Sequence, residues 1–433
     1  MKVWVSFILL LSGPFIAHAA STLSPVENQI QSYIVQQRPA QIALLKKLVN
    51  INSGTSNLKG IYRVGHIIQQ QLNALGFKTH WAFEPPMMRR AGTLIAESQG
   101  KKGKRLLLIG HLDTVFSPAG SFKTFTQKDN TAKGPGIIDD KGGVVVLLYT
   151  LKALHSVHAL DDATILVVLT GDEEDSGKPS NISRKPLIEA AKQAEIALDF
   201  EPSISQSTVS IARRGIGGWA IETKGNESHS ATLFLPEVGD GAIFEMARIL
   251  TTMRIEFERD KKLVLNPGIV LGGNRIHFEE KTSSGAAFGK DNVVSKTALA
   301  HGDYRFENDE QKAKFKTIVT KIVDAHLPGT HSMVTFEEGI PAMAPTPANL
   351  KLLTVYSQAS KDLGQGDIKP LPANVRGAGD ISYVAAFMTA NLAGLGPIGS
   401  GTHSSIESIQ LDSLTTQTER AAIFMYRLLN ATE

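Results

Sequence analysis

The segment "GHLDTVF", residues 110–116, places a histidine and an aspartate two positions apart, directly after the apolar run "RLLLI". If that run is a strand, its side chains alternate between two faces, so His111 and Asp113 project to the same side. The carboxylate can then orient the imidazole, as it does at many metal-binding histidines. For this short motif alone, a surface turn after an edge strand is an equally simple explanation.

Acidic and histidine residues recur in four further segments. Each has an ordinary structural explanation by itself, because acidic runs occur in solvated turns and an aspartate before a helix is usually a cap. The segments are "GPGIIDDKGG" with Asp139 and Asp140, "TGDEEDSG" with Glu173 and Glu174, "LDFEPS" with Glu201, and "GSGTHSSIES" with His403.

The placement of these segments together favours a metal site. His111, the Glu173–Glu174 pair and Glu201 each follow the end of a predicted strand, and ligands of open α/β sheets bind at that edge. Imidazoles and carboxylates suit zinc or a similar divalent ion, and two such ions can share a bridging carboxylate. Without cations, acids gathered at one edge would repel one another strongly. Of two adjacent glutamates, one can bind metal while the other moves protons.

The elements predicted around these motifs alternate between strands and helices. Such alternation predicts an α/β fold, with a mixed or parallel sheet that helices cover on both faces. The N-terminal part, about 25–76, has helical spacing of its apolar residues and ends at Gly76. The later elements are strands at 105–110, 164–171, 195–200 and 389–396, and helices at 142–157, 185–194, 348–364 and 415–430.

The pattern changes near residue 213. Antiparallel-looking strands are predicted at 213–225, 296–306 and 332–339, with helices at 240–257 and 309–326. We therefore predict a smaller α+β domain, residues 213–338, that interrupts a larger domain made of residues 21–212 and 339–433.

Composition narrows the classes of function. The 433 residues are 42% hydrophobic and 20% charged, and the net charge of +3 comes with no basic tract longer than "KKGKR", so we expect no nucleic-acid partner. The absence of cysteine excludes a cysteine nucleophile, thiolate zinc sites and iron–sulfur clusters. Residues 1–20 have the charge, apolar run and small residues of a signal peptide, which predicts a secreted or periplasmic protein with no membrane attachment after cleavage.

These motifs resemble the zinc metallopeptidase family of aminoacylases, succinyl-diaminopimelate desuccinylases and carboxypeptidase G, most closely its glutamate carboxypeptidase branch. The resemblance covers nearly all of the chain after residue 20. The motifs that carry it, H-x-D-T-V, G-P-G-x-x-D-D-K-G-G, D-E-E and F-E-P, occur in the family's order.

The resemblance implies a role for each site residue. Asp139 would bridge two zinc ions, and a cis peptide bond would follow it. Asp113 would orient His111, and Glu173 would be the general base. The remaining implied ligands are His111 and Glu201 for one ion, and Glu174 and His403 for the other.

The insert resembles the family's lid and dimerisation domain, which implies a homodimer. "GNESHSA" matches the segment whose histidine polarises the scissile carbonyl, often across a dimer, so His229 is that residue by resemblance. "GDYRF" matches the segment whose arginine binds a substrate carboxylate, which implies Arg305, with Asn292 as a further substrate contact. Asp380 in "RGAGDIS" is expected to be structural. The run "SATLFLPEVG" departs from the family pattern after the lid histidine.

The expected function is that of a dizinc exopeptidase. Its substrates would be peptides or N-acyl amino acids, from which it would release a C-terminal amino acid, glutamate foremost. An N-acyl-amino-acid deacylase or a dipeptidase needs the same metal centre and remains an alternative. A non-catalytic binding protein on the same fold is the alternative from another class, although the intact Glu173 and ligand set argue against it.

Overall fold

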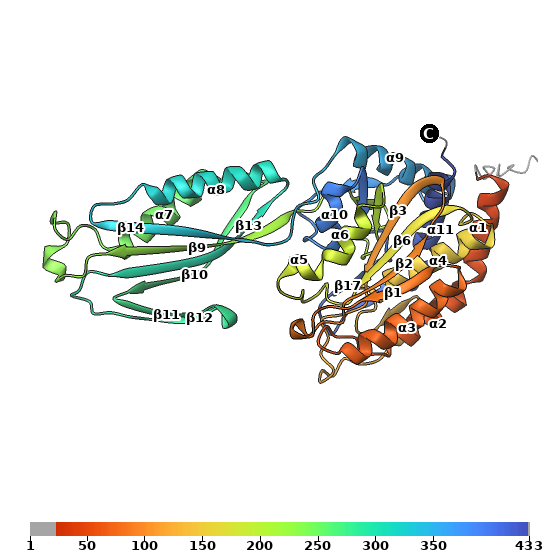
Figure 1. The fold of residues 1–433 in the computed structure, drawn as a ribbon, viewed down its shortest axis with the longest axis horizontal. Helices are drawn as coiled ribbons and strands as arrows, with labels where there is room; N and C mark the ends of the chain where they lie inside the picture. Colours follow the sequence, from red (N-terminus) through yellow and green to blue (C-terminus); the bar gives the residue numbers. More distant parts are fainter. Residues whose placement is uncertain (1–22, 432–433) are drawn as a thin grey trace, which may run out of the picture.

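A computed structural model describes residues 23–431, so the predicted signal peptide lies outside the described residues. We keep the predicted division of the chain for naming: residues 213–338 are the smaller domain and the other described residues are the larger domain. Figure 1 shows the smaller domain extending away from the larger one, with two segments of chain connecting them.

The larger domain is built on an eight-stranded mixed sheet with the order β1-β2-β6-β3-β7-β16-β8-β15. The four neighbours β6, β3, β7 and β16 run parallel, whereas β1 and β2 add an antiparallel edge. The strands are β1 (Lys78–Ala82), β2 (Thr93–Ser98), β3 (Lys102–His111), β6 (Ala163–Thr170), β7 (Ile196–Asp199), β8 (Thr208–Ser210), β15 (Lys369–Leu371) and β16 (Ala390–Ala393).

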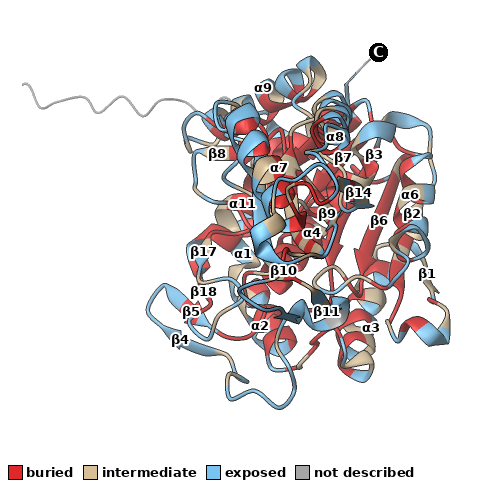
Figure 2. Cartoon of the chain, turned by 90° about the vertical axis from the view of Figure 1, so that its left-hand side faces the viewer, coloured by how far each residue is buried: buried red, intermediate tan, exposed pale blue. Residues whose placement is uncertain are grey.

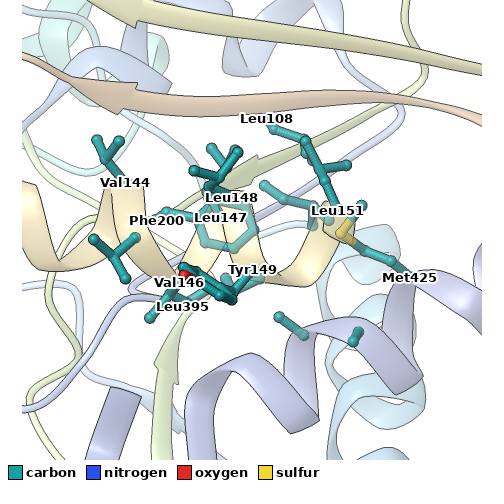
Figure 3. Packing of buried hydrophobic residues seen from close by; sticks show 14 of the residues in the cluster. Leu108, Val144, Val146, Leu147, Leu148, Tyr149, Leu151, Phe200, Leu395 and Met425 are labelled. Atoms are coloured by element: carbon teal, nitrogen blue, oxygen red, sulfur yellow. The ribbon is translucent and has the colours of Figure 1, made fainter. Parts of the chain in front are cut away.

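Alternating side chains of β3 pack into two separate cores, because both faces of the sheet are covered. Leu106 and Leu108 pack with α4 (Lys141–Ser156) and α11 (Leu411–Leu429), as Figure 3 shows for Leu108, Leu151 and Met425. Leu107 and Ile109 pack on the other face with α6 (Lys185–Ala191) and α10 (Asp380–Val384). Figure 2 shows the central strands as buried along most of their length.

Among the described residues, five further α-helices complete the larger domain, and four of them pack apolar residues into the core shared with α4 and α11. The first begins at a capping box, in which Ser24 and Glu27 each bind the backbone N–H of the other. These helices are α1 (Pro25–Gln36), α2 (Arg38–Val49), α3 (Leu58–Ala74), α5 (Ser180–Ser183) and α9 (Pro347–Asp362). The four that pack into this core are α1, α2, α3 and α9.

A second, four-stranded antiparallel sheet has the order β17-β18-β5-β4. It joins the segment before Asp139 to the loop that carries His403, because Ser408 pairs with Lys133. Its strands are β4 (Thr126–Lys128), β5 (Thr131–Lys133), β17 (Gly399–Ser400) and β18 (Ser408–Gln410).

The smaller domain is an antiparallel sheet with the order β10-β13-β9-β14, covered on one face by two helices. A hairpin of β11 and β12 lies on the other side, where Phe278 contacts His301. The elements are β9 (Gly215–Gly225), α7 (Ala242–Phe257), β10 (Val264–Gly273), β11 (Arg275–Glu279), β12 (Ser284–Phe288), β13 (Thr297–Phe306), α8 (Asp309–Asp324) and β14 (Thr330–Glu338).

The predicted fold class is confirmed: the architecture is α/β with a large mixed sheet. The sequence analysis did not identify the antiparallel edge strands β1 and β2, nor the hairpin of β11 and β12. None of the helices among residues 23–431 is both long enough and apolar enough to cross a bilayer.

Candidate metal centre

The register of the parallel strands brings the predicted motifs to one edge of the large sheet. His111, the last residue of β3, pairs with Thr170 at the end of β6, and Glu173 and Glu174 follow three and four residues later. On the other side of β3, Ile109 pairs with Asp199, the end of β7, two residues before Glu201.

His111 is held between two aspartates. Its Nδ1 atom lies 3.3 Å from Asp113 Oδ1, and its Nε2 atom lies 3.0 Å from Asp139 Oδ1. Burial lowers the pKa of His111, but the hydrogen bonds to Asp113 and Asp139 raise it, and the net shift is upward. This is the arrangement in which one ring nitrogen is fixed by a carboxylate and the other is presented to the site.

Asp113 also organises the loop after β6. Its carboxylate accepts the backbone N–H of Glu173 at 3.0 Å and of Glu174 at 3.2 Å, together with the Thr55 hydroxyl at 2.6 Å. Because Asp113 is fully buried, these bonds are shielded from water. One carboxylate therefore positions His111 and the adjacent Glu173 and Glu174 at once.

Asp139 lies between two imidazoles and contacts each with a different oxygen. Oδ1 faces His111, whereas Oδ2 lies 3.2 Å from His403 Nε2. His403 Nε2 also lies 3.1 Å from Glu174 Oε2. Burial raises the pKa of Asp139, but the hydrogen bonds from His111 and His403 lower it strongly. This carboxylate therefore presents one oxygen to each of the two histidines.

The backbone at Asp139 has the form that the resemblance implies, since the Asp139–Asp140 peptide bond is cis. Gly143 leaves room for the side chain of Asp140 and for the Phe200 carbonyl. A Cβ atom on Gly143 would lie 2.1 Å from Asp140 Oδ1 and 2.0 Å from the Phe200 carbonyl oxygen. Only glycine fits at that position.

Glu201 is placed differently from the other predicted ligands. Its carboxylate Oε2 contacts Arg213 Nη2 at 2.8 Å and Arg376 Nη2 at 2.7 Å. Burial raises the pKa of Glu201, but Arg213 and Arg376 lower it to below its ordinary value. The ligand atoms of His111, Asp139 and Glu174 all lie within 4.8 Å of one another. Neither Glu201 nor His403 is part of that group, although His403 contacts Asp139 and Glu174. The role of Glu201 as a ligand stays a prediction.

The donor set fits a divalent metal ion. Two imidazoles converge on carboxylates without any thiol, which is a set typical of zinc. Among the described residues, Glu174 Oε1 is buried and has no hydrogen-bond partner. Burial also raises the pKa of this carboxyl to about 7. A cation at this position would give that oxygen a partner.

The predicted substrate-binding residues lie in the smaller domain, but they do not form one cluster. His229 and Asn292 are neighbours: residue 229 bridges to Val293, and the N–H of Ser230 donates to the Asn292 carbonyl at 2.9 Å. Arg305 pairs with Asp303 at 2.9 Å, near the opposite end of β13. A ten-residue strand such as β13 spans about 30 Å.

The end of the smaller domain that carries His229 points away from the large sheet. Strands β9 and β13 pair from Gly215 and Phe306, beside the larger domain, to Lys224 and Thr297 at the far end. The segment after β9 follows that far end, as Figure 1 shows. Within one chain, the structure therefore does not bring His229 to the metal edge.

Sequence reasoning missed several charged residues around the site. Arg184 is buried and forms ion pairs with Asp172 at 2.7 Å and with Asp380 at 2.6 Å, beside the loop that carries Glu173. Arg213 and Arg376 were missed in the same way, although Arg213 begins the predicted strand 213–225 and Arg376 begins the segment "RGAGDIS". Asp380 lies in this buried pair and accepts the Thr170 hydroxyl at 2.6 Å, which agrees with its expected structural role.

Comparisons with known proteins identify relatives of this chain by sequence and by fold. Carboxypeptidase G2 of Pseudomonas sp. (strain RS-16) is 31% identical over 391 residues, which cover 87% of this chain and 86% of the relative. The solved structure of aminopeptidase PepT from Bacillus cereus matches with a TM-score of 0.70 at 17% identity, covering 92% of this chain and 98% of that one.

A second solved structure is the Bacillus subtilis YXEP protein, a dinuclear metal binding peptidase from M20 family. It matches with a TM-score of 0.62 at 12% identity, covering 92% of this chain and 100% of that one. The model of peptidase family M20/M25/M40 matches residues 107–427, which include all five predicted metal ligands. The chain therefore belongs to peptidase family M20/M25/M40, a family of metallopeptidases.

Proposed function

We propose that this protein is a dizinc exopeptidase that releases a C-terminal amino acid, glutamate foremost, from peptides or N-acyl amino acids. The observation that carries the proposal is Asp139, whose two oxygens face His111 and His403 from one carboxylate. The likeness to carboxypeptidase G2 supports the choice of a free C-terminal substrate.

The five predicted ligands would hold the metal. His111, Asp139 and Glu201 would bind one zinc ion, and Asp139, Glu174 and His403 would bind the other. Glu201 would have to give up its contact with Arg213 or Arg376 to bind the metal. Two zinc ions would supply polarisation of the scissile carbonyl and a lowered pKa for an attacking water.

Glu173 is the proposed general base. It is adjacent to Glu174, and Asp113 fixes its backbone N–H beside the metal centre, while the five predicted ligands do not include it. It would accept the proton of the attacking water and then deliver it to the leaving amine, which is the ordinary cycle of a carboxylate acid–base catalyst.

The smaller domain would supply substrate contacts. Arg305 would bind the free carboxylate of the substrate with its planar guanidinium, and His229 would donate a hydrogen bond to the carbonyl oxygen as charge develops there. Because His229 and Asn292 lie at the far end of this domain, we propose a homodimer in which they act on the partner chain's site.

A substrate panel tests the proposal. Purified protein with zinc should hydrolyse N-acyl glutamate and peptides with a C-terminal glutamate, and should hydrolyse peptides whose C-terminus is amidated much more slowly. Hydrolysis only of other N-acyl amino acids, or only of free dipeptides, would replace this proposal with a deacylase or a dipeptidase. Binding without turnover of any substrate would indicate a non-catalytic protein.

A further inference from the structure

Glu407 is a buried carboxylate that lies next to the metal centre without belonging to its ligand set. Its side chain is fully buried and accepts three backbone N–H groups: Gly136 at 3.0 Å, Ile138 at 2.8 Å and Asp139 at 3.1 Å. These bonds use three of the about four acceptor sites of the carboxylate, and both oxygens face backbone N–H groups.

The same residue closes the loop that carries His403. Its N–H donates to the Ser404 carbonyl at 3.1 Å, and its own carbonyl accepts the N–H of Gly134 at 3.4 Å. The next residue, Ser408, begins the pairing of β18 with β5. Glu407 therefore connects the loop that carries His403 to the segment that ends in Asp139, through both its side chain and its backbone.

His403 needs such an anchor. Its side chain is 56% exposed, and its backbone has a φ angle of 61°, an uncommon conformation for a residue that is not glycine. The two polar contacts of its ring, to Asp139 and Glu174, are both with predicted ligands. The position of the loop before metal binding must therefore be set elsewhere, and Glu407, four residues later, supplies the buried contacts.

A carboxylate suits this position better than an amide. Three N–H groups point at the side chain, and a carboxylate offers only acceptors, whereas a glutamine would direct its NH₂ group at one of these donors. Removing an acceptor from buried N–H groups leaves them unsatisfied, which is costly. The requirement is for a side chain that can accept all three N–H groups, and not merely for one of that size.

We propose that Glu407 is a positioning residue for the metal centre: it holds the backbone of Asp139 and the His403 loop so that the two ligands face each other before metal binds. The inference rests on the proposed metallopeptidase function. A positioning role differs from a purely structural role in its prediction. Substituting Glu407 should lower metal affinity, whereas substituting a comparable buried glutamate elsewhere should not.

The test compares Glu407→Gln with Glu419→Gln. Glu419, on α11, is a matched control because it is also a buried glutamate of the C-terminal segment. Its carboxylate accepts a hydrogen bond from the side chain of Gln365, which is not part of a ligand-bearing loop. Metal-free protein is titrated with Zn²⁺ against a chromophoric chelator, and thermal unfolding of the metal-free variants is recorded in parallel.

We expect Glu407→Gln to weaken zinc binding about 10- to 100-fold, the usual effect of losing a group that orients a ligand. Glu419→Gln should keep the wild-type affinity within about twofold on the same scale. Glu407→Asp, which keeps the charge, should lose less affinity than Glu407→Gln. Wild-type affinity in Glu407→Gln, or an equal loss in Glu419→Gln, would overturn the proposal.

Two further outcomes keep this test separate from the proposed function. If neither Glu407 variant folds with or without zinc while Glu419→Gln does, Glu407 belongs to the fold itself and the proposal is wrong. If wild-type protein binds zinc but cleaves no amide substrate, the proposed function fails, whereas the comparison of zinc affinities still decides the role of Glu407.

Discussion

The metal edge of the large sheet and the binding residues of the smaller domain are built in opposite ways. At the metal edge, His111 and Asp113 are buried. Hydrogen bonds fix their side chains and also the loop after β6, which carries Glu173 and Glu174. In the smaller domain, His229 and Asn292 are exposed, and Arg305 lies at the other end of the sheet. The first set is assembled within one chain, whereas the second is not.

This difference separates two kinds of function. Groups that hold a metal and move protons gain from a fixed, water-poor arrangement, because preorganised charges do not have to reorient during the reaction. Groups that bind a substrate must let it enter and leave, and such groups commonly lie on parts that close over the site. Substitutions in the two regions should therefore change different measured quantities.

The largest effect is expected at Glu173. Glu173→Gln should lower kcat by about 100- to 10,000-fold, the contribution of a general acid–base, while zinc content stays at the wild-type level. Glu174→Ala is the contrasting variant, since it removes a predicted ligand and should lower zinc content itself. Equal zinc contents in the two variants, measured by elemental analysis, would contradict the division of labour.

The next effect is expected at His229. His229→Ala should lower kcat by about 100- to 1,000-fold, as removal of a donor to a developing oxyanion does. An equal mixture of the His229→Ala and Glu173→Gln variants should recover about a quarter of the wild-type rate. Half of the randomly paired dimers contain both variants, and each such dimer has one intact site of its two. Mixtures that stay inactive after subunit exchange would show that His229 does not act across a dimer.

A smaller effect is expected at Arg305. Arg305→Lys keeps the charge but loses the planar pair of donors, so kcat/KM should fall about 10- to 100-fold. Amidation of the substrate's C-terminal carboxylate should cost the wild type a similar factor, and the two losses should not add. Arg254→Lys, on an exposed surface of α7, is the control. Equal rates for free and amidated substrates would exclude a carboxypeptidase.

The smallest effect concerns Thr55. Thr55→Val removes the hydroxyl that donates to Asp113 at 2.6 Å and should lower the free energy of unfolding of the metal-free protein by about 1–3 kcal/mol. Thr317→Val, at an exposed position of α8, should change it by less than about 0.5 kcal/mol. Urea denaturation of both variants measures this, and equal values would show that the buried network does not stabilise the metal edge.

The sequence predicted the parts of the fold that depend on local pattern. The run before His111 is a short continuous apolar segment and the stretch after Asp140 is a longer one, lengths that suit a buried strand and a buried helix. Parallel strands necessarily bring their ends to one edge. The hairpin of β11 and β12 was missed because its second strand, "SGAAF", is exposed throughout and shows no alternation of apolar and polar residues.

The contacts of the site that cross the sequence could not be predicted in the same way. Glu201 is separated from Arg376 by 175 positions, and Glu407 from Gly136 by 271, so no local pattern reports either contact. The direction in which the smaller domain points His229 also depends on how two separately folded sheets are joined, and this is not visible in the periodicity of either one.

The number of metal ions per chain tests the central claim most directly. Protein loaded with zinc and freed of excess metal should contain close to two divalent ions per chain by elemental analysis, and removing them with a chelator should abolish amide hydrolysis. One ion per chain in a sample that retains full activity would contradict the bridging role of Asp139 and the dinuclear mechanism built on it.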